Sequence, residues 1–233
     1  MKKKLYEARD HLMGGISYAL PVIIGGSLVV AVAKIIGFAG GVSNLDDYAQ
    51  AGGFFHYVWM FQNVGWSAIG LLNLVLSGYI AYSIAGKPAL AAGFVGGVLA
   101  STTNAGFLGA VVTGFFAGWI TNKIKNTVKI KGAAASSVPL IILPLLTIGL
   151  TGILMALILG GPLGWINTSL LNWVTKMSEN NTNVVILAVI LAAMIGFDLG
   201  GPVNKAAWMA GNALFMSGIY LPSILVNVAI WIP

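Results

Sequence analysis

The feature that most constrains this chain is a series of long apolar runs interrupted by very few charges. Of its 233 residues, 58% are hydrophobic and only 8% are charged, and the mean hydropathy is +0.91. A soluble protein of this length cannot bury so much apolar surface while covering itself with so few charges. Helical runs of about 20 apolar residues match the thickness of a bilayer core. The sequence therefore predicts an all-α, polytopic transmembrane protein.

The apolar runs predict about six to seven spanning segments, some of them broken or re-entrant. We expect spans over residues 12–38, 64–85 and 138–159. Residues 89–100 and 105–120 form either two short spans or one span and a re-entrant piece, and periodicity does not separate these alternatives. The 31 glycines favour closely packed helices, and small-residue faces such as the one that contains Gly93 make a homodimer an expectation.

The charged residues predict the orientation of the chain. The densest group of lysines lies within residues 123–131, whereas Asp46 and Asp47 lie in a polar loop after the first apolar run. Because cytoplasmic loops are enriched in Lys and Arg, we expect residues 1–11 and 123–131 to be cytoplasmic. The net charge of +6 then reflects membrane topology, and nucleic acid is not an expected partner.

The composition and motifs exclude several kinds of chemistry. The chain has no cysteine, which removes disulfides, thiolate metal sites and a cysteine nucleophile. No nucleotide-binding loop, Ser/His/Asp triad or zinc-protease motif is present, so we expect no cofactor, no metal and no catalytic residue in this chain. His11 follows Asp10 and either contacts a substrate or is a solvated histidine at the membrane interface.

One motif, residues 196–207, places an acid, an amide and a base around a Gly-Gly-Pro sequence directly after the apolar run 184–195. Proline interrupts a helix, so we expect a helix end, a turn and a new helix near Val203. The freed backbone groups and Asn204 can bind a hydroxylated or phosphorylated ligand. The alternative is a structural ion pair that closes a helix hairpin. The candidate substrate-binding residues are Asp198, Gly200, Gly201, Asn204, Lys205 and His11.

Residues 11–21, 77–85, 87–97 and 197–207 together resemble the membrane subunit, IIC, of the fructose-type bacterial phosphotransferase system. The resemblance implies a multi-pass permease of the bacterial inner membrane that moves a fructose-like hexose or hexitol across the lipid bilayer. It also implies cytoplasmic IIB and IIA partners, which carry the phosphoryl group on their own Cys and His residues. This chain would then be the membrane component of a protein-phosphohistidine–sugar phosphotransferase.

The resemblance also implies a domain organisation, with residues 1–233 forming one IIC-type transmembrane domain. We expect a helical bundle over residues 12–159, an amphipathic linker helix over 160–183, and the start of the substrate-transport half over 184–233. Family members continue into a glycine-threonine-glutamate block that this sequence lacks, so the chain looks like the amino-terminal two-thirds of a IIC subunit. The alternative function is a truncated remnant that inserts and assembles without transporting sugar.

Overall fold

The computed structural model describes residues 2–127, 141–179, 184–197 and 207, and every regular element within them is helical. The prediction of an all-α protein is therefore confirmed. The chain divides into two compact units: unit 1 comprises Met1–Leu99 and Ala110–Met155, and unit 2 comprises Ala100–Gly109 and Ala156–Pro233. The principal elements are α1 (Lys2–Ala39), η1 (Leu45–Tyr48), α2 (Phe54–Gly70), α3 (Leu72–Ala85), η2 (Lys87–Ala89), α4 (Leu90–Thr102), α5 (Gly106–Thr127), α6 (Leu143–Ile153), the π-helix η5 (Leu154–Leu159), α7 (Gly160–Glu179) and α8 (Val184–Phe197).

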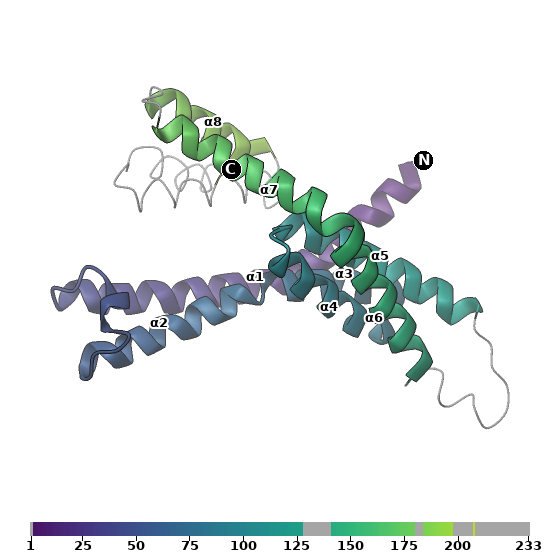
Figure 1. Cartoon of the computed structure of the whole chain (residues 1–233), viewed down its shortest axis with the longest axis horizontal. Coiled ribbons are helices and arrows are strands. Elements are labelled where there is room, and N and C mark those ends of the chain that lie inside the picture. Colours follow the sequence, from purple (N-terminus) through teal and green to yellow (C-terminus); the bar gives the residue numbers. More distant parts are fainter. Residues whose placement is uncertain (1, 128–140, 180–183, 198–206, 208–233) are drawn as a thin grey trace. The chain divides into compact units, whose positions relative to one another are not determined.

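In unit 1, α1 and α2 form a long antiparallel hairpin (Figure 1). Helix α1 has 38 residues with Pro21 inside it, and its length of about 57 Å is well above the roughly 30 Å of a bilayer core. The two helices touch backbone to backbone at Gly26 and Gly65. A Cβ atom on Gly26 would lie 2.8 Å from the Gly65 carbonyl oxygen, and one on Gly65 would lie 2.6 Å from the Gly26 carbonyl oxygen.

Helix α2 begins at Phe54, ten residues before the predicted span 64–85. The predicted span 64–85 lies within the helical segment Phe54–Ala85, whose first turns carry polar residues. The short helix η1 provides their partners: Gln62 Nε2 donates to Asp46 Oδ1 at 3.3 Å, and His56 Nδ1 lies 3.1 Å from the Tyr48 carbonyl oxygen. A buried polar group with a partner is compatible with a helix in an apolar environment.

Helix α3 is enclosed by glycines from three other helices of unit 1. A Cβ atom on Gly15 of α1 would lie 3.0 Å from the Leu76 carbonyl oxygen. A Cβ atom on Gly93 of α4 or on Gly114 of α5 would lie 2.8 Å from the Ser77 carbonyl oxygen. These contacts bring three backbones against α3, so α3 is the central helix of unit 1.

The described part of the chain contains four helical segments that are long and apolar enough to cross a membrane. They are Leu5–Ala39, Phe54–Ala85, Gly106–Thr127 and Leu143–Ile166. Helix α4, between the second and third of these, has 13 residues and a length of about 20 Å, less than a bilayer core requires. Gly93 of α4 lies against Ser77 and Gly97 against Asn73, so α4 runs antiparallel to α3, and the choice between two short spans and one span with a re-entrant piece stays a prediction. The total number of spans stays a prediction.

Unit 2 contains α7, α8 and the turn between α4 and α5. The turn holds Asn104 and Gly106 in left-handed conformations, each with φ of 56°, and Gly164 of α7 packs against the Thr103 carbonyl group. Helix α7 covers most of the predicted linker helix 160–183, whereas its position at a membrane interface stays a prediction.

We predict that Gly26→Ala destabilises the protein by about 1–3 kcal/mol, because the added methyl group overpacks the contact with Gly65. Gly25 is a matched control, since a Cβ atom there has no heavy atom within 4 Å. Gly25→Ala should leave stability unchanged or raise it by roughly 0.5–1 kcal/mol through helix propensity. Thermal unfolding in detergent measures both, and equal effects of the two substitutions would contradict the crossing at Gly26.

Candidate functional site

One polar contact joins α1 to α3 through a residue that the sequence singles out. His11 Nδ1 lies 2.7 Å from Ser83 Oγ. The approach is close because Gly14 stands one turn after His11; a Cβ atom on Gly14 would lie 3.5 Å from Ser83 Oγ. The contact fixes the orientation of the imidazole ring and leaves its Nε2 atom available to another group.

Aromatic residues continue this contact along the same pair of helices. The rings of Tyr18 and Tyr79 are stacked, with centroids 3.9 Å apart and an interplanar angle of 14°. Tyr82 lies edge-on to Tyr79, with centroids 6.1 Å apart. His11 and Tyr18 are two turns apart and share one side of α1. We call the set His11, Tyr18, Tyr79, Tyr82 and Ser83 the α1–α3 polar face.

The α1–α3 polar face combines an imidazole ring, hydroxyl groups and aromatic rings, and it contains no carboxylate. Such a set donates and accepts hydrogen bonds and offers ring faces for stacking, but it lacks the paired acids of a glycosidase-type centre. Among the described residues, no group of His, Cys, Asp and Glu is arranged to hold a metal ion. The arrangement is therefore suited to holding a neutral, hydroxylated ligand.

A second polar group lies in the interior of unit 1. Ser77 Oγ of α3 and Thr113 Oγ1 of α5 are 3.1 Å apart, and both residues are buried. A Cβ atom on Gly96 of α4 would lie 2.7 Å from the Thr113 Cβ atom and 3.1 Å from the Thr151 Cγ2 atom of α6. Hydrogen bonds between membrane helices contribute about 0.6 kcal/mol on average. We interpret this group as packing between α3, α4, α5 and α6.

The structure describes only one of the predicted substrate-binding residues, His11, and gives it the partner Ser83. The other residues of that prediction, Asp198, Gly200, Gly201, Asn204 and Lys205, lie outside the described residues. Helix α8 is described as far as Phe197, and the helix end and turn predicted after it lie outside the described residues.

Sequence reasoning missed the partners of His11. Ser83 is 72 residues away from it in the chain, and no spacing rule connects positions so far apart. The blocks 11–21 and 77–85, which both carry the family resemblance, face each other in the structure. The glycines of block 87–97 are also explained: Gly93 packs inside unit 1 and does not provide a surface for a homodimer.

The fold and the polar face define a class: an all-α, polytopic, membrane-embedded protein with hydrogen-bonding groups placed on apolar helices. Comparison with known families narrows this class. The family model described as "Phosphotransferase system, EIIC" matches residues 13–225. The chain therefore belongs to the phosphotransferase system EIIC family, as the sequence resemblance predicted.

Several curated relatives are similar to the chain over nearly its whole length. The fructose-specific EIIABC component of Bacillus subtilis (strain 168) is 34% identical over 224 residues, covering 96% of this chain and 34% of the relative. The 2-O-alpha-mannosyl-D-glycerate-specific EIIABC component of Escherichia coli (strain K12) is 38% identical, covering 93% and 32%. Fructose-like permease IIC component 2 of the same organism is 31% identical, covering 98% and 61%. The chain thus spans about a third to three fifths of these relatives. No solved structure matches it.

We predict that His11 and Ser83 are energetically coupled. In a double-mutant cycle, His11→Ala and Ser83→Ala should be non-additive by about 0.5–1.5 kcal/mol, because either substitution alone removes the same hydrogen bond. Thermal unfolding in detergent measures the coupling. Ser17→Ala is the control partner, since Ser17 Oγ donates only to the carbonyl oxygen of Met13 in its own helix. Additivity of the His11 and Ser83 substitutions would show that the contact contributes nothing.

Proposed function

We propose that this chain is the sugar-translocating membrane component, IIC, of a fructose-type phosphoenolpyruvate-dependent phosphotransferase system. The observation that carries the proposal is the family match across residues 13–225 together with relatives whose names specify fructose. The chain binds the sugar and moves it across the membrane, and a separate IIB component phosphorylates it. These 233 residues contain no cysteine, so the phosphorylated cysteine of a IIB component would lie outside them.

We place the sugar site at the motif 196–207, with Asp198, Asn204 and Lys205 as the ligands. An acid and a base within or beside membrane-spanning helices cost about 2.5–3.5 kcal/mol each on insertion scales, which makes a functional role the default interpretation. A carboxylate accepts hydrogen bonds from sugar hydroxyls, and an amide both donates and accepts them. Gly200 and Gly201 let a ligand approach the backbone closely.

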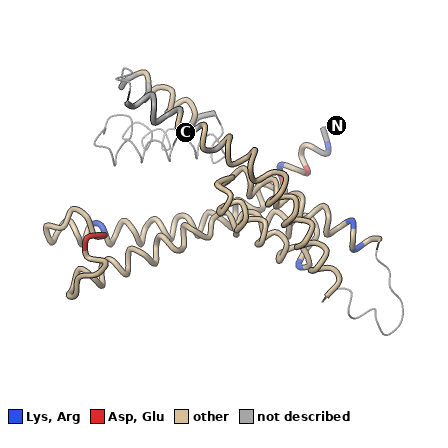
Figure 2. The backbone as a smooth tube through the Cα atoms, in the orientation of Figure 1, with Lys and Arg blue, Asp and Glu red and all other residues tan. Residues whose placement is uncertain are grey.

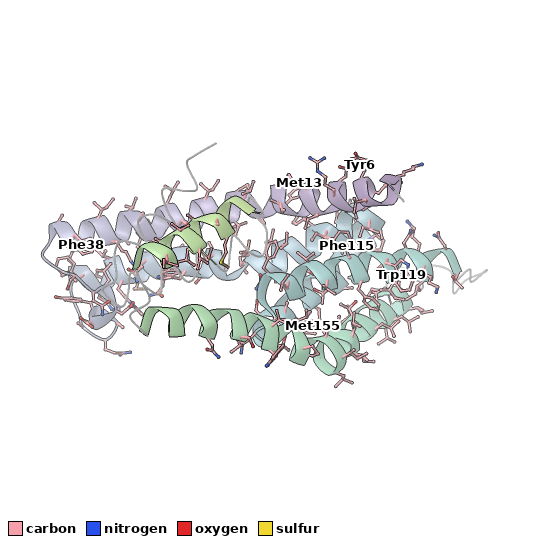
Figure 3. All side chains as sticks on the ribbon, turned by 90° about the horizontal axis from the view of Figure 1, so that it is seen from above. Tyr6, Met13, Phe38, Phe115, Trp119 and Met155 are labelled. Carbon is pink, nitrogen blue, oxygen red and sulfur yellow. The ribbon has the colours of Figure 1, made fainter. Side chains whose placement is uncertain are left out.

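The ends of unit 1 support a cytoplasmic amino terminus in the bacterial inner membrane. Helix α3 runs antiparallel to α1, so its last turn lies near the start of α1, where His11 contacts Ser83. Helix α5 runs parallel to α3, with Gly118 against Ile84. Figure 2 shows Lys and Arg at this end, and in Figure 3 Tyr6 and Trp119 lie toward it, with Phe38 at the opposite end of α1.

The proposed partners are a fructose-like hexose or hexitol, the cytoplasmic IIB and IIA phosphocarriers and the surrounding lipid bilayer. A homodimer is also proposed. The large apolar side chains exposed along α1, such as Leu28 at 61% and Ile35 at 66%, support burial of this helix in lipid or against a second copy.

We predict that Asp198→Asn and Lys205→Met each abolish sugar uptake in the complete transport assembly, because each removes a charged ligand of the site. Lys129→Met is the control, since Lys129 belongs to the predicted basic loop and should leave uptake unchanged. Uptake of labelled fructose into cells that also contain IIB and IIA measures the effect. Normal uptake by both site variants would refute the assignment.

The double substitution Asp198→Asn, Lys205→Met separates the site from the structural alternative. An ion pair that only closes a hairpin would let the double variant fold and transport, whereas a sugar site would let it fold without transport. Membrane abundance and fructose uptake, measured together, distinguish these outcomes.

We also predict the orientation of the chain. Because these 233 residues contain no cysteine, a single cysteine introduced among them reports its own position. A cysteine at the exposed residue Ser43 should react with a membrane-impermeant maleimide in intact cells, whereas one at the exposed residue Lys125 should react only after permeabilisation. The reverse pattern would place the amino terminus outside.

A further inference from the structure

The α1–α3 polar face is exposed in unit 1 although it belongs to helices long and apolar enough to span a membrane. Tyr18 is 51% exposed, Tyr82 is 36% exposed, and Ser83 is also exposed. These residues lie within the candidate spans Leu5–Ala39 and Phe54–Ala85. Polar side chains are thus exposed at positions where a spanning helix would otherwise meet lipid.

Lipid is an unsuitable neighbour for these groups. The hydroxyl groups of Tyr18, Tyr79 and Tyr82 make no hydrogen bond to any residue that the structure describes. A hydroxyl group transferred to hydrocarbon without a partner costs on the order of several kcal/mol. Each hydroxyl therefore requires water or a polar ligand.

The opposite side of α1 behaves differently. At 100° per residue, Leu20 lies across the helix from His11, and Leu20 and Ile24 are exposed by 48% and 55%. These side chains are apolar and match lipid. Helix α1 therefore presents two distinct exposed sides in the same part of its length, one apolar and one polar.

We propose that the α1–α3 polar face borders a water-filled path and contacts the sugar as it passes. This inference rests on the proposed function. Ring faces of Tyr18 and Tyr82 stack on the C–H groups of a sugar, and phenol, hydroxyl and imidazole groups bind its hydroxyls. His11 uses Nδ1 to contact Ser83, so its Nε2 is the ring atom directed to a ligand or to water.

The absence of native cysteines permits a direct test by single-cysteine substitution. Tyr18→Cys and Leu20→Cys form a matched pair, since the parent side chains have nearly the same exposure and lie only about 3 Å apart along the helix axis. The reacting species is the thiolate, and an apolar environment raises the pKa of a thiol. We expect a charged methanethiosulfonate reagent to modify Tyr18→Cys at least about tenfold faster than Leu20→Cys. A thiol pKa that is one unit higher at the lipid-facing position would alone reduce the thiolate fraction by about that factor.

The second readout is protection by sugar. With IIB and IIA present, fructose should slow the modification of Tyr18→Cys, measured on this chain alone because IIB carries a reactive cysteine of its own. 2-O-α-Mannosyl-D-glycerate serves as the second probe. Ser83→Cys, a nearly isosteric change, repeats both measurements on α3 if Tyr18→Cys does not reach the membrane. Equal modification rates for Tyr18→Cys and Leu20→Cys would overturn the proposal.

Fast labelling without protection, in an assembly that takes up one of these sugars, would also overturn it. That result would assign the tyrosines to the aromatic belt at the lipid headgroups. Failure of the proposed function looks different: the unmodified assembly would then neither take up nor phosphorylate either sugar. Fast labelling of Tyr18→Cys relative to Leu20→Cys would in that case still support a water-filled path, for another hydroxylated solute.

Discussion

The structure of unit 1 depends on the close approach of α3 to its neighbours. In lipid there is no hydrophobic force to bring apolar helices together, so association relies on van der Waals contact and on short polar interactions. Glycine permits both kinds of contact, because without a side chain it lets one helix backbone touch another. Gly15, Gly93 and Gly114 come from three different helices, and each places its backbone against Leu76 or Ser77 of α3. A side chain at any of these positions would push one helix away from the centre.

The polar contacts of the unit follow from this approach. Ser77 reaches Thr113 only because Gly114 brings α5 against the backbone of α3. His11 reaches Ser83 in the same way, with Gly14 and Gly15 one turn along α1. The glycines and the hydroxyl groups are therefore parts of one arrangement, in which backbone contact sets the distance and side-chain hydrogen bonds set the register between helices.

The sequence predicted the helical class and the family, since both depend on local properties: apolar run length and contiguous motifs. It did not identify the partners of Gln62 and His56, which are Asp46 and Tyr48 of η1. It also singled out His11 without identifying Ser83. Pairings between residues far apart in the chain depend on how helices cross, and one sequence carries no local signal for that.

We propose that the sugar binds at the charged motif 196–207. A polar solute must also leave water before it reaches such a site and return to water afterwards. Charges near the end of one helix do not provide for that passage. A face of phenol, hydroxyl and imidazole groups on α1 and α3 does, because it replaces water hydrogen bonds while the aromatic rings cover the apolar side of the sugar. If Tyr18 contacts the sugar in transit, replacing it with Phe, which keeps the ring and removes the hydroxyl, should weaken uptake less than replacing it with Ala.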